Sequence, residues 1–229
     1  MIYHDCDDEI STDAIEKLLL GFSKSPDIDA TLFDLKVEDR EGKLHDFRYF
    51  SADEILEGGD CFWESLNNWG VHSLVCLKKD IFIKANSLYD EYNLFHKNNI
   101  SNDEVIGRLC WLFCRKVAKT DAIYIYKNNL KSTTKNVNQN FYSVLLNDLI
   151  LHKILTSKNL MRNSYYVYMI NTMRLVVDKY FIWRSQLVER DLWRMQLKKS
   201  FWFISHYWRV LPLKWKRKFI KLFFRIYLL

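Results

Sequence analysis

The chain has 229 residues, of which 49% are hydrophobic and 16% aromatic, so it can bury the core of one substantial domain, or of one domain with an appendage. This composition excludes a wholly disordered protein, and the small numbers of glycines (6) and prolines (2) disfavour a loop-rich architecture. The net charge is +6, and no run of 18 or more uncharged apolar residues occurs, so the sequence predicts no membrane-spanning segment.

The first part of the chain predicts helices and strands in alternation. After the acidic segment "HDCDDEIS", Asp13 and Glu16 form a capping box at the start of a helix. The buried stripe predicted for this helix consists of Ile15, Leu18, Leu19 and Phe22. In "ATLFDLKVED" apolar and charged residues alternate, which is typical of a half-exposed strand, and "REGK" predicts the turn after it.

The clearest helix is predicted in "NNISNDEVIGRLCWLFCRKVAKT", where Ser101 and Glu104 form a second capping box. Its predicted apolar face consists of Ile106, Leu109, Cys110, Phe113 and Val117. "DAIYIYK" predicts a short strand, "NNLKSTTKN" a polar loop, and the chain from Phe141 onward only helices. We therefore expect an α/β region over residues 1–140 and an all-α region over residues 141–229.

The five cysteines are odd in number and include no Cys-x-x-Cys pair. Because no signal peptide is recognisable at the N-terminus, they predict reduced thiols in a cytoplasmic protein. Cys110 and Cys114 lie one helical turn apart, and we expect them to pack in the core. A zinc site built on His4 and Cys6 lacks further ligands at a suitable spacing, so none is predicted.

The acidic cluster near the N-terminus is the first candidate for chemistry. Asp5 and Asp7 alternate across one residue, and in an extended segment both carboxylates point to the same side. Hard oxygen ligands of this kind suit magnesium or manganese, which keep open positions for phosphate oxygens. The alternative is a solvated acidic terminus, in which the charges simply favour the start of the following helix.

The second candidate is Asp103, in the first turn of the clearest predicted helix. From there its carboxylate could face a cleft and act as a general base. The alternative is again structural, because the capping box accounts for Glu104 and the helix dipole accounts for Asp103. The position of Asp103 by itself favours the structural interpretation.

Taken in order, three segments resemble glycosyltransferase family 2. "HDCDDEISTDAIEKLLLGF" resembles the family's Asp-x-Asp-Asp segment and the helix after it. "LKKDIFIKANSLYDEYNLFHKNNISNDEVIGRL" is similar to its Lys-Arg-Asp, Asn-Leu-x-Phe and Glu-Asp-x-Glu stretch, and "AIYIYKNNLKSTT" to its closing Tyr-x-Tyr-Arg strand and Ser-Thr loop. The resemblance is collinear and covers about residues 2–135.

The resemblance implies an inverting sugar transferase with a GT-A fold, in which a Rossmann-like sheet binds a nucleotide-sugar donor. It implies a divalent metal, manganese or magnesium, held by Asp5 and Asp7 with Asp8 as an auxiliary ligand. Asp5 would contact either the ribose or the metal shell, and Asp103 stands where the family places the base that deprotonates the acceptor. Lys127 stands at a common arginine position and would reach the diphosphate; the alternative is an exposed lysine at a strand end.

Two features depart from the family's pattern. Asn102 stands where the family usually has Glu, and no Trp-x-Lys motif can be placed near Trp69. The resemblance also starts at the Asp-x-Asp segment, so we expect the N-terminal nucleotide-binding part, on the order of 80–100 residues, to be absent. The predicted function is transfer of a sugar to a saccharide or lipid-linked saccharide in bacterial surface polysaccharide synthesis, such as O-antigen or capsule. The alternatives are a non-catalytic remnant or interaction module, or an enzyme whose missing half another polypeptide supplies.

The charge distribution sets the C-terminal region apart. Residues 1–60 carry 17 acidic and 6 basic side chains, whereas residues 181–229 carry 2 acidic and 12 basic ones. On a helical wheel of residues 213–229 the basic face consists of Lys214, Arg217, Lys218, Lys221 and Arg225, and the apolar face of Trp215, Phe219, Leu222, Phe223 and Ile226. This pattern predicts a helix lying on an anionic membrane surface, at the inner face of the cell membrane. The alternatives are packing of the apolar face inside the protein and binding of single-stranded nucleic acid, which the acidic N-terminal half disfavours.

Overall fold

The computed structural model of the chain describes residues 1–2, 4–94, 98–129 and 136–227, and only the backbone of Asn68. The protein is a mixed α/β protein, as the sequence predicts, with a six-stranded sheet. It forms two compact units. The sheet unit comprises residues 1–90 and 103–130, and the helical unit comprises residues 91–102 and 131–229.

The sheet is built around two long strands, β2 (Ile28–Glu38) and β6 (Lys116–Tyr126), which pair in parallel. Four short strands pair with them in antiparallel fashion: β1 (Glu9–Ile10) and β4 (Ile55–Glu57) with β6, and β3 (Leu44–Asp46) and β5 (Val75–Leu77) with β2. The first six residues of β2 are all buried, whereas the sequence predicts a half-exposed strand, because β2 has neighbours on both edges and helices on both faces. Among the described strands, only β2 and β6 pair in parallel, so this sheet is mixed.

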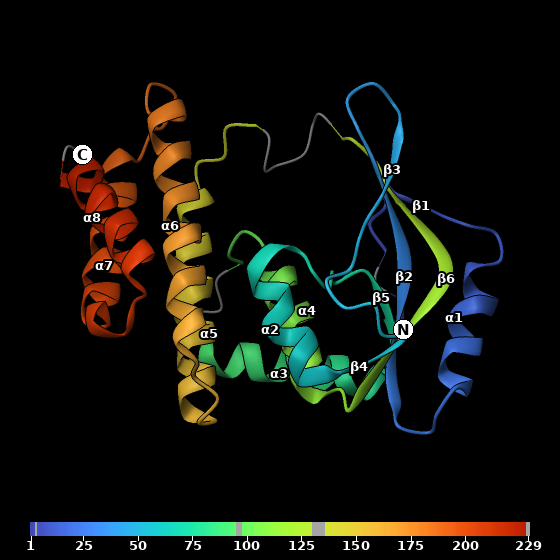
Figure 1. Ribbon diagram of the computed structural model, residues 1–229. Helices are drawn as coiled ribbons and strands as arrows, with labels where there is room; N and C mark the ends of the chain where they lie inside the picture. Colours follow the sequence, from blue (N-terminus) through green and yellow to red (C-terminus); the bar gives the residue numbers. More distant parts are fainter. Residues whose placement is uncertain (3, 95–97, 130–135, 228–229) are drawn as a thin grey trace. The chain divides into compact units, whose positions relative to one another are not determined.

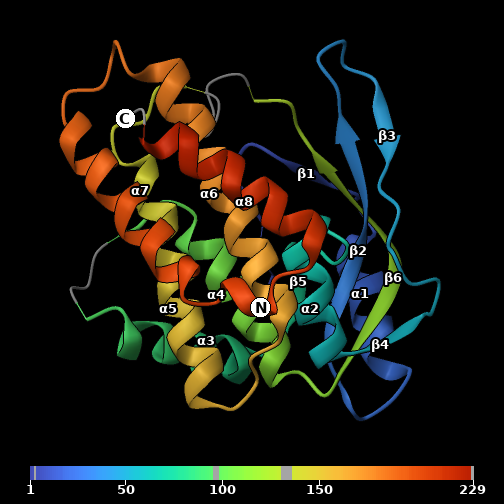
Figure 2. The ribbon, with the colours of Figure 1, turned by 60° about the vertical axis from the view of Figure 1, so that its left-hand side comes forward.

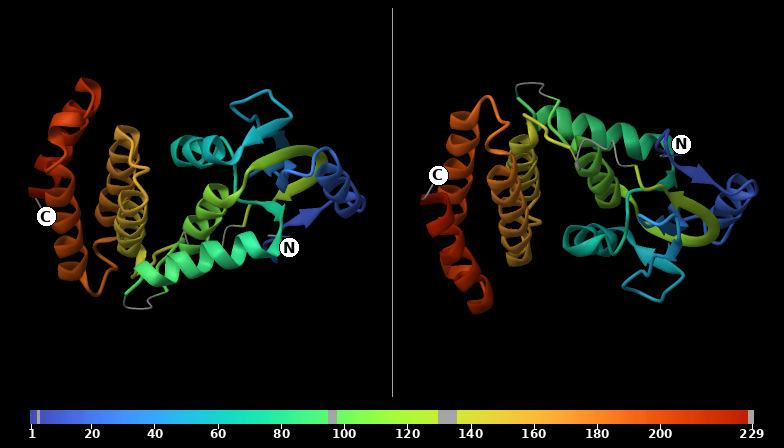
Figure 3. Two further views of the ribbon diagram at one scale, coloured as in Figure 1. Left: turned by 90° about the horizontal axis from the view of Figure 1, so that it is seen from below. Right: turned by 90° about the horizontal axis from the view of Figure 1, so that it is seen from above.

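Helices cover both faces of the sheet. Figures 1 and 3 show α1 (Ala14–Ser23) on one face, where it packs on β2 and β6, and α2 (Gly58–Asn68), α3 (Lys79–Tyr92) and α4 (Asn102–Phe113) on the other. One core cluster consists of Ala14, Leu18, Phe33, Leu35, Leu74, Cys76, Ala122 and Tyr124. The long stretch between β2 and β6 provides the crossover that a parallel pair requires.

Helix α1 buries only part of the predicted stripe. Leu18 is buried and Phe22 packs against the core, as predicted, whereas Ile15 and Leu19 are exposed. Ala14 and Gly21 are buried in their place. A Cβ atom on Gly21 would lie 2.7 Å from a methyl group of Thr120, so the helix approaches the sheet through its smallest side chains. Asp13 precedes the helix but makes no capping hydrogen bond, and its carboxylate pairs with Lys17 at 3.0 Å.

Helix α4 also differs from its prediction at both ends. Ser101 has a φ of 60°, outside the extended conformation of a capping residue, and Glu104 pairs with Arg108 at 3.0 Å. The helix ends at Phe113, so Val117 lies in strand β6 and not on the helix. At this end the buried carboxylate of Asp29 accepts a hydrogen bond from the backbone N–H of Arg115 at 2.9 Å, which fixes the chain as it enters β6.

The helical unit contains α5 (Val144–Ser157), α6 (Asn163–Trp183), α7 (Arg190–Ser205) and α8 (Leu213–Tyr227), with short 3-10 helices at Phe141–Ser143 and Trp208–Val210. The long helix α6 contacts the other three, and Figure 2 shows α8 running beside it. The prediction that the chain from Phe141 onward is helical is therefore confirmed for the described residues. None of the described helices is both long enough and apolar enough to cross a bilayer.

Candidate functional site

The acidic segment near the N-terminus folds as a tight turn. The backbone N–H of Asp8 donates to the carbonyl oxygen of Asp5 at 3.2 Å, and strand β1 begins only at Glu9. The prediction that Asp5 and Asp7 share one side of an extended segment is therefore wrong. The carboxylates are arranged by this turn and by its contacts with β6.

Asp8 anchors the turn to the end of β6. Its carboxylate is buried and accepts hydrogen bonds from the Tyr124 hydroxyl at 2.7 Å and from the backbone N–H of Lys127 at 2.8 Å. One bond goes to each carboxylate oxygen, so both oxygens are engaged. Asp8 therefore has a structural role in holding the turn and is not a candidate metal ligand.

Asp5 and Asp7 are less enclosed than Asp8. Asp7 accepts a hydrogen bond from the side-chain amide of Asn129 at 2.6 Å and is exposed. The backbone N–H of Asp5 donates to the Tyr124 hydroxyl at 3.1 Å. Burial raises the pKa of the Asp5 carboxyl, and the negative charges of Asp8, Asp103 and Asp7 raise it further, so Asp5 lies in a negative field that a cation would relieve.

The fold brings Asp103 close to Asp5. Asp103 lies in the first turn of α4, nearly a hundred positions away in the sequence, yet its charge contributes to the raised pKa of Asp5. The two residues that the sequence analysis proposed for separate tasks therefore share one electrostatic environment. A cluster of carboxylates with a perturbed pKa is a common mark of a functional site.

The two tyrosines of the Tyr-x-Tyr strand and Trp69 lie in the same region. Tyr124 and Tyr126 alternate along β6, so they lie on one face of the strand. Burial raises the pKa of Tyr126, as do the charges of nearby carboxylates, including Asp5 and Glu104. The ring of Trp69 meets Tyr126 edge to face at 5.6 Å between centroids. The Tyr-x-Tyr spacing is visible in the sequence, but the contact between Tyr126 and Trp69 is seen only in the structure.

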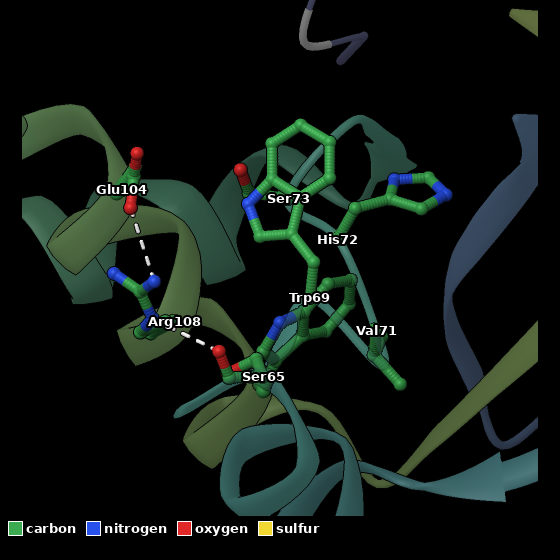
Figure 4. A pocket seen from close by; sticks show the side chains of 8 residues that line it. Ser65, Trp69, Val71, His72, Ser73, Glu104 and Arg108 are labelled. Atoms are coloured by element: carbon green, nitrogen blue, oxygen red, sulfur yellow. Dashed lines mark hydrogen bonds and ion pairs between the residues drawn. The ribbon is translucent and has the colours of Figure 1, made fainter. Parts of the chain in front are cut away.

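Trp69 also lines a small hollow against α4 (Figure 4). Glu104 and Arg108 form an ion pair at its edge, and the Arg108 guanidinium also donates to the carbonyl oxygen of Ser65 at 3.5 Å. The hollow has a volume of about 10 Å³, enough for about one water molecule. The hollow is therefore too small for an organic ligand.

Lys127 follows directly after β6 and is engaged by two acidic side chains. Its ammonium group lies 3.2 Å from the Glu9 carboxylate and 3.3 Å from that of Glu38. These contacts raise the pKa of Lys127, so it stays charged. A diphosphate would have to compete with both carboxylates for it. The Ser-Thr part of the following loop lies outside the described residues.

The described residues contain no group of three or more His, Cys, Asp or Glu side chains that could hold a metal ion. His4 packs edge-on against Tyr124 at 5.6 Å, and the described cysteines are free, with Cys110 and Cys114 buried as predicted. Magnesium commonly takes one or two protein carboxylates and completes its shell with water and phosphate oxygens. A site of that smaller kind could use Asp5 and Asp7, the two predicted ligands that are exposed.

Comparison of the chain with protein-family models, with curated proteins and with solved structures finds no match. The residues of this surface themselves indicate what chemistry it can support. It combines carboxylates, one with a raised pKa, with the partly buried rings of Trp69 and Tyr126. Such a surface can attract a cation, accept protons from hydroxyl groups and offer aromatic area to a ligand.

Proposed function

We propose that the chain takes part in sugar transfer and binds a nucleotide-sugar donor and a saccharide acceptor at the surface formed by Asp5, Asp7, Asp103, Trp69 and Tyr126. The observation that carries the proposal is geometric: Trp69 contacts Tyr126 of β6 and lines one hollow with Glu104, the neighbour of Asp103 in α4. Two residues before Tyr126, the Tyr124 hydroxyl bonds to the turn that carries Asp5 and Asp7. Sugar hydroxyls donate hydrogen bonds to carboxylates, and the C–H face of a sugar ring packs against aromatic rings. The order of motifs that resembles family 2 supports the same conclusion, and we propose with it that the sheet unit is part of a GT-A domain.

The proposed cofactor is a divalent cation, manganese or magnesium, held by Asp5 and Asp7. When bound, it would neutralise negative charge on the diphosphate of the donor. Asp8 acts indirectly, because it fixes the turn that carries the other two carboxylates. Lys127 could also bind the diphosphate, provided that its ammonium group first breaks its ion pairs with Glu9 and Glu38.

Asp103 is the proposed general base. The acceptor hydroxyl oxygen bonds to the anomeric carbon of the donor, the bond from that carbon to the diphosphate oxygen breaks, and the hydroxyl proton passes to the Asp103 carboxylate. Attack from the face opposite the leaving group inverts the anomeric configuration. We place this reaction in bacterial surface polysaccharide synthesis, on a saccharide or lipid-linked saccharide acceptor at the cytoplasmic face of the membrane.

The second candidate function is a module that binds saccharide without turnover. The engagement of Lys127 by Glu9 and Glu38 favours it, because a free cation at the diphosphate position would aid departure of the leaving group. Binding of an acceptor saccharide would then survive while sugar transfer would be absent.

Two measurements on the whole chain test these functions. Calorimetry with a panel of nucleotide-sugars, with and without manganese, reports donor binding, and release of nucleoside diphosphate in the presence of saccharide acceptors reports transfer. We expect Asp103→Asn to lower transfer by about a hundred- to ten-thousandfold without weakening donor binding. Asp5→Asn should remove the manganese dependence of binding. Asp121→Asn, which removes an exposed carboxylate paired with Lys17, is the matched control.

Full transfer activity in Asp103→Asn would refute its part as the base. Saccharide binding without transfer in the unaltered chain would favour the second candidate. If neither donor nor saccharide binds, with or without manganese, both candidate functions are wrong.

A further inference from the structure

The C-terminal helix α8 packs into the helical unit through the residues predicted to face a membrane. Phe219, Leu222 and Ile226 are almost fully buried, and α8 contacts α6 and α7. The Phe219 ring stacks on Phe201 of α7, with 4.3 Å between centroids and 4° between planes. These three residues therefore pack inside the protein and do not face a membrane, so most of the predicted apolar face of α8 belongs to the core.

The opposite side of α8 carries a second row of apolar side chains. Leu213, Ile220, Phe224 and Tyr227 are 70%, 46%, 60% and 77% exposed. At 100° per residue these four positions fall within an arc of about 60° on the helix surface. A row of large apolar side chains on one exposed arc differs from the scattered apolar residues normal on a protein surface.

Basic side chains continue directly from this apolar row. Arg217, Lys221 and Lys214 occupy the next arc of about 60° and are exposed. In the part of the chain that the structure describes, no carboxylate lies within ion-pair distance of these three. Arg225, by contrast, is paired with Asp178 at 2.6 Å. The exposed side of α8 therefore presents an apolar row beside a row of uncompensated positive charge, which we call the outer face.

We propose that the outer face of α8 docks the protein on an anionic phospholipid surface. A helix with apolar side chains on one arc and Lys or Arg beside them lies in the plane of the headgroups, with its apolar row inserted and its cations on the lipid phosphates. Two members of the apolar row, Leu213 and Ile220, are aliphatic and cannot stack on bases, so the face suits lipid better than single-stranded nucleic acid. This docking does not depend on the proposed sugar transfer.

Flotation with vesicles of equal parts phosphatidylcholine and phosphatidylglycerol tests the proposal on the whole chain. Replacing Lys214, Arg217 and Lys221 together by Gln should weaken binding on the order of a hundredfold, because each cation near an anionic surface contributes about a factor of five to ten. The control, Lys43→Gln with Lys79→Gln and Lys153→Gln, removes the same charge from exposed positions outside α8 and should bind as the unaltered chain does.

The apolar row needs its own variant and control. Ile220→Ser with Phe224→Ser should weaken binding about tenfold or more, whereas Leu175→Ser with Ile182→Ser, at exposed positions of α6, should not. All four variants change surface residues, and thermal unfolding will verify that each is folded. The proposal would be overturned if a variant and its control lost vesicle binding equally, or if the unaltered chain bound pure phosphatidylcholine vesicles equally well. Binding of an oligonucleotide but not of vesicles would also overturn it.

Discussion

The core histidine His72 makes the stability of the sheet unit depend on pH. His72 is 1% exposed; its Nδ1 accepts a hydrogen bond from the backbone N–H of Leu74 at 3.2 Å. Its Nε2 lies 2.9 Å from the Tyr49 hydroxyl, which donates to the carbonyl oxygen of Phe33. A second proton, on Nδ1, would break the bond to Leu74 and bury a positive charge. Burial accordingly lowers the pKa of His72 from 6.5 to about 4.

The sign and size of the effect follow from this difference. Between pH 6.5 and pH 4 the unfolded chain binds a proton at this position and the folded chain does not, so stability falls as the pH is lowered. A difference of about 2.5 pKa units corresponds to about 3 kcal/mol in all, of which about 2 kcal/mol is lost between pH 7 and pH 5. That loss equals about a thirtyfold change in the equilibrium for opening the unit.

Hydrogen exchange of the β2 amides confines the measurement to the sheet unit. After correction for intrinsic exchange rates, we expect their protection to fall about thirtyfold more between pH 7 and pH 5 in the unaltered chain than in His72→Gln. Glutamine does not titrate but can still form hydrogen bonds in that position. An identical pH dependence in both proteins, or an NMR titration of His72 with an ordinary pKa, would refute the reasoning.

Two further predictions concern the scaffold of the site. Asp29 is buried and accepts hydrogen bonds from Arg115 and Lys78, so Asp29→Asn should lower the free energy of unfolding by about 2–3 kcal/mol in urea denaturation. Because Arg115 and Lys78 lower the pKa of Asp29, the contribution of the ionised carboxylate to the free energy of unfolding should persist down to about pH 4 and be lost below it. Loss of this contribution already at pH 6 would contradict the prediction. A Cβ atom on Gly58 would lie 2.0 Å from the Cys114 carbonyl oxygen, whereas one on Gly59 meets nothing within 4 Å. Gly58→Ala should therefore destabilise the protein by about 2 kcal/mol or more, and Gly59→Ala should stabilise it by up to about 1 kcal/mol. A lower melting temperature for Gly59→Ala than for Gly58→Ala would refute the close packing of Gly58 on Cys114.

The sequence by itself determined the fold class, the strand around Phe33 and Leu35, and the helical nature of the C-terminal region, because hydrophobic periodicity is a local property of the chain. It also identified Asp5 and Asp103 as candidates, since clustered acidic residues and a helix start can be recognised locally. It could not determine which side of a helix is buried when both sides carry apolar residues. Helices α1 and α8 are both of this kind, and in each the neighbouring elements decide.

The tertiary structure alone decided the composition of the candidate site. Asp8 is buried and holds the N-terminal turn in place only because the end of β6 brings the Tyr124 hydroxyl and the Lys127 N–H within hydrogen-bond distance of its carboxylate. Asp103 influences Asp5 only because α4 begins near that turn. Long-range interactions of this kind leave no periodic pattern, since about a hundred positions of chain separate the residues they join. For the same physical reason, the exposed apolar row of α8 could be identified only after the structure had shown that its other apolar face is core.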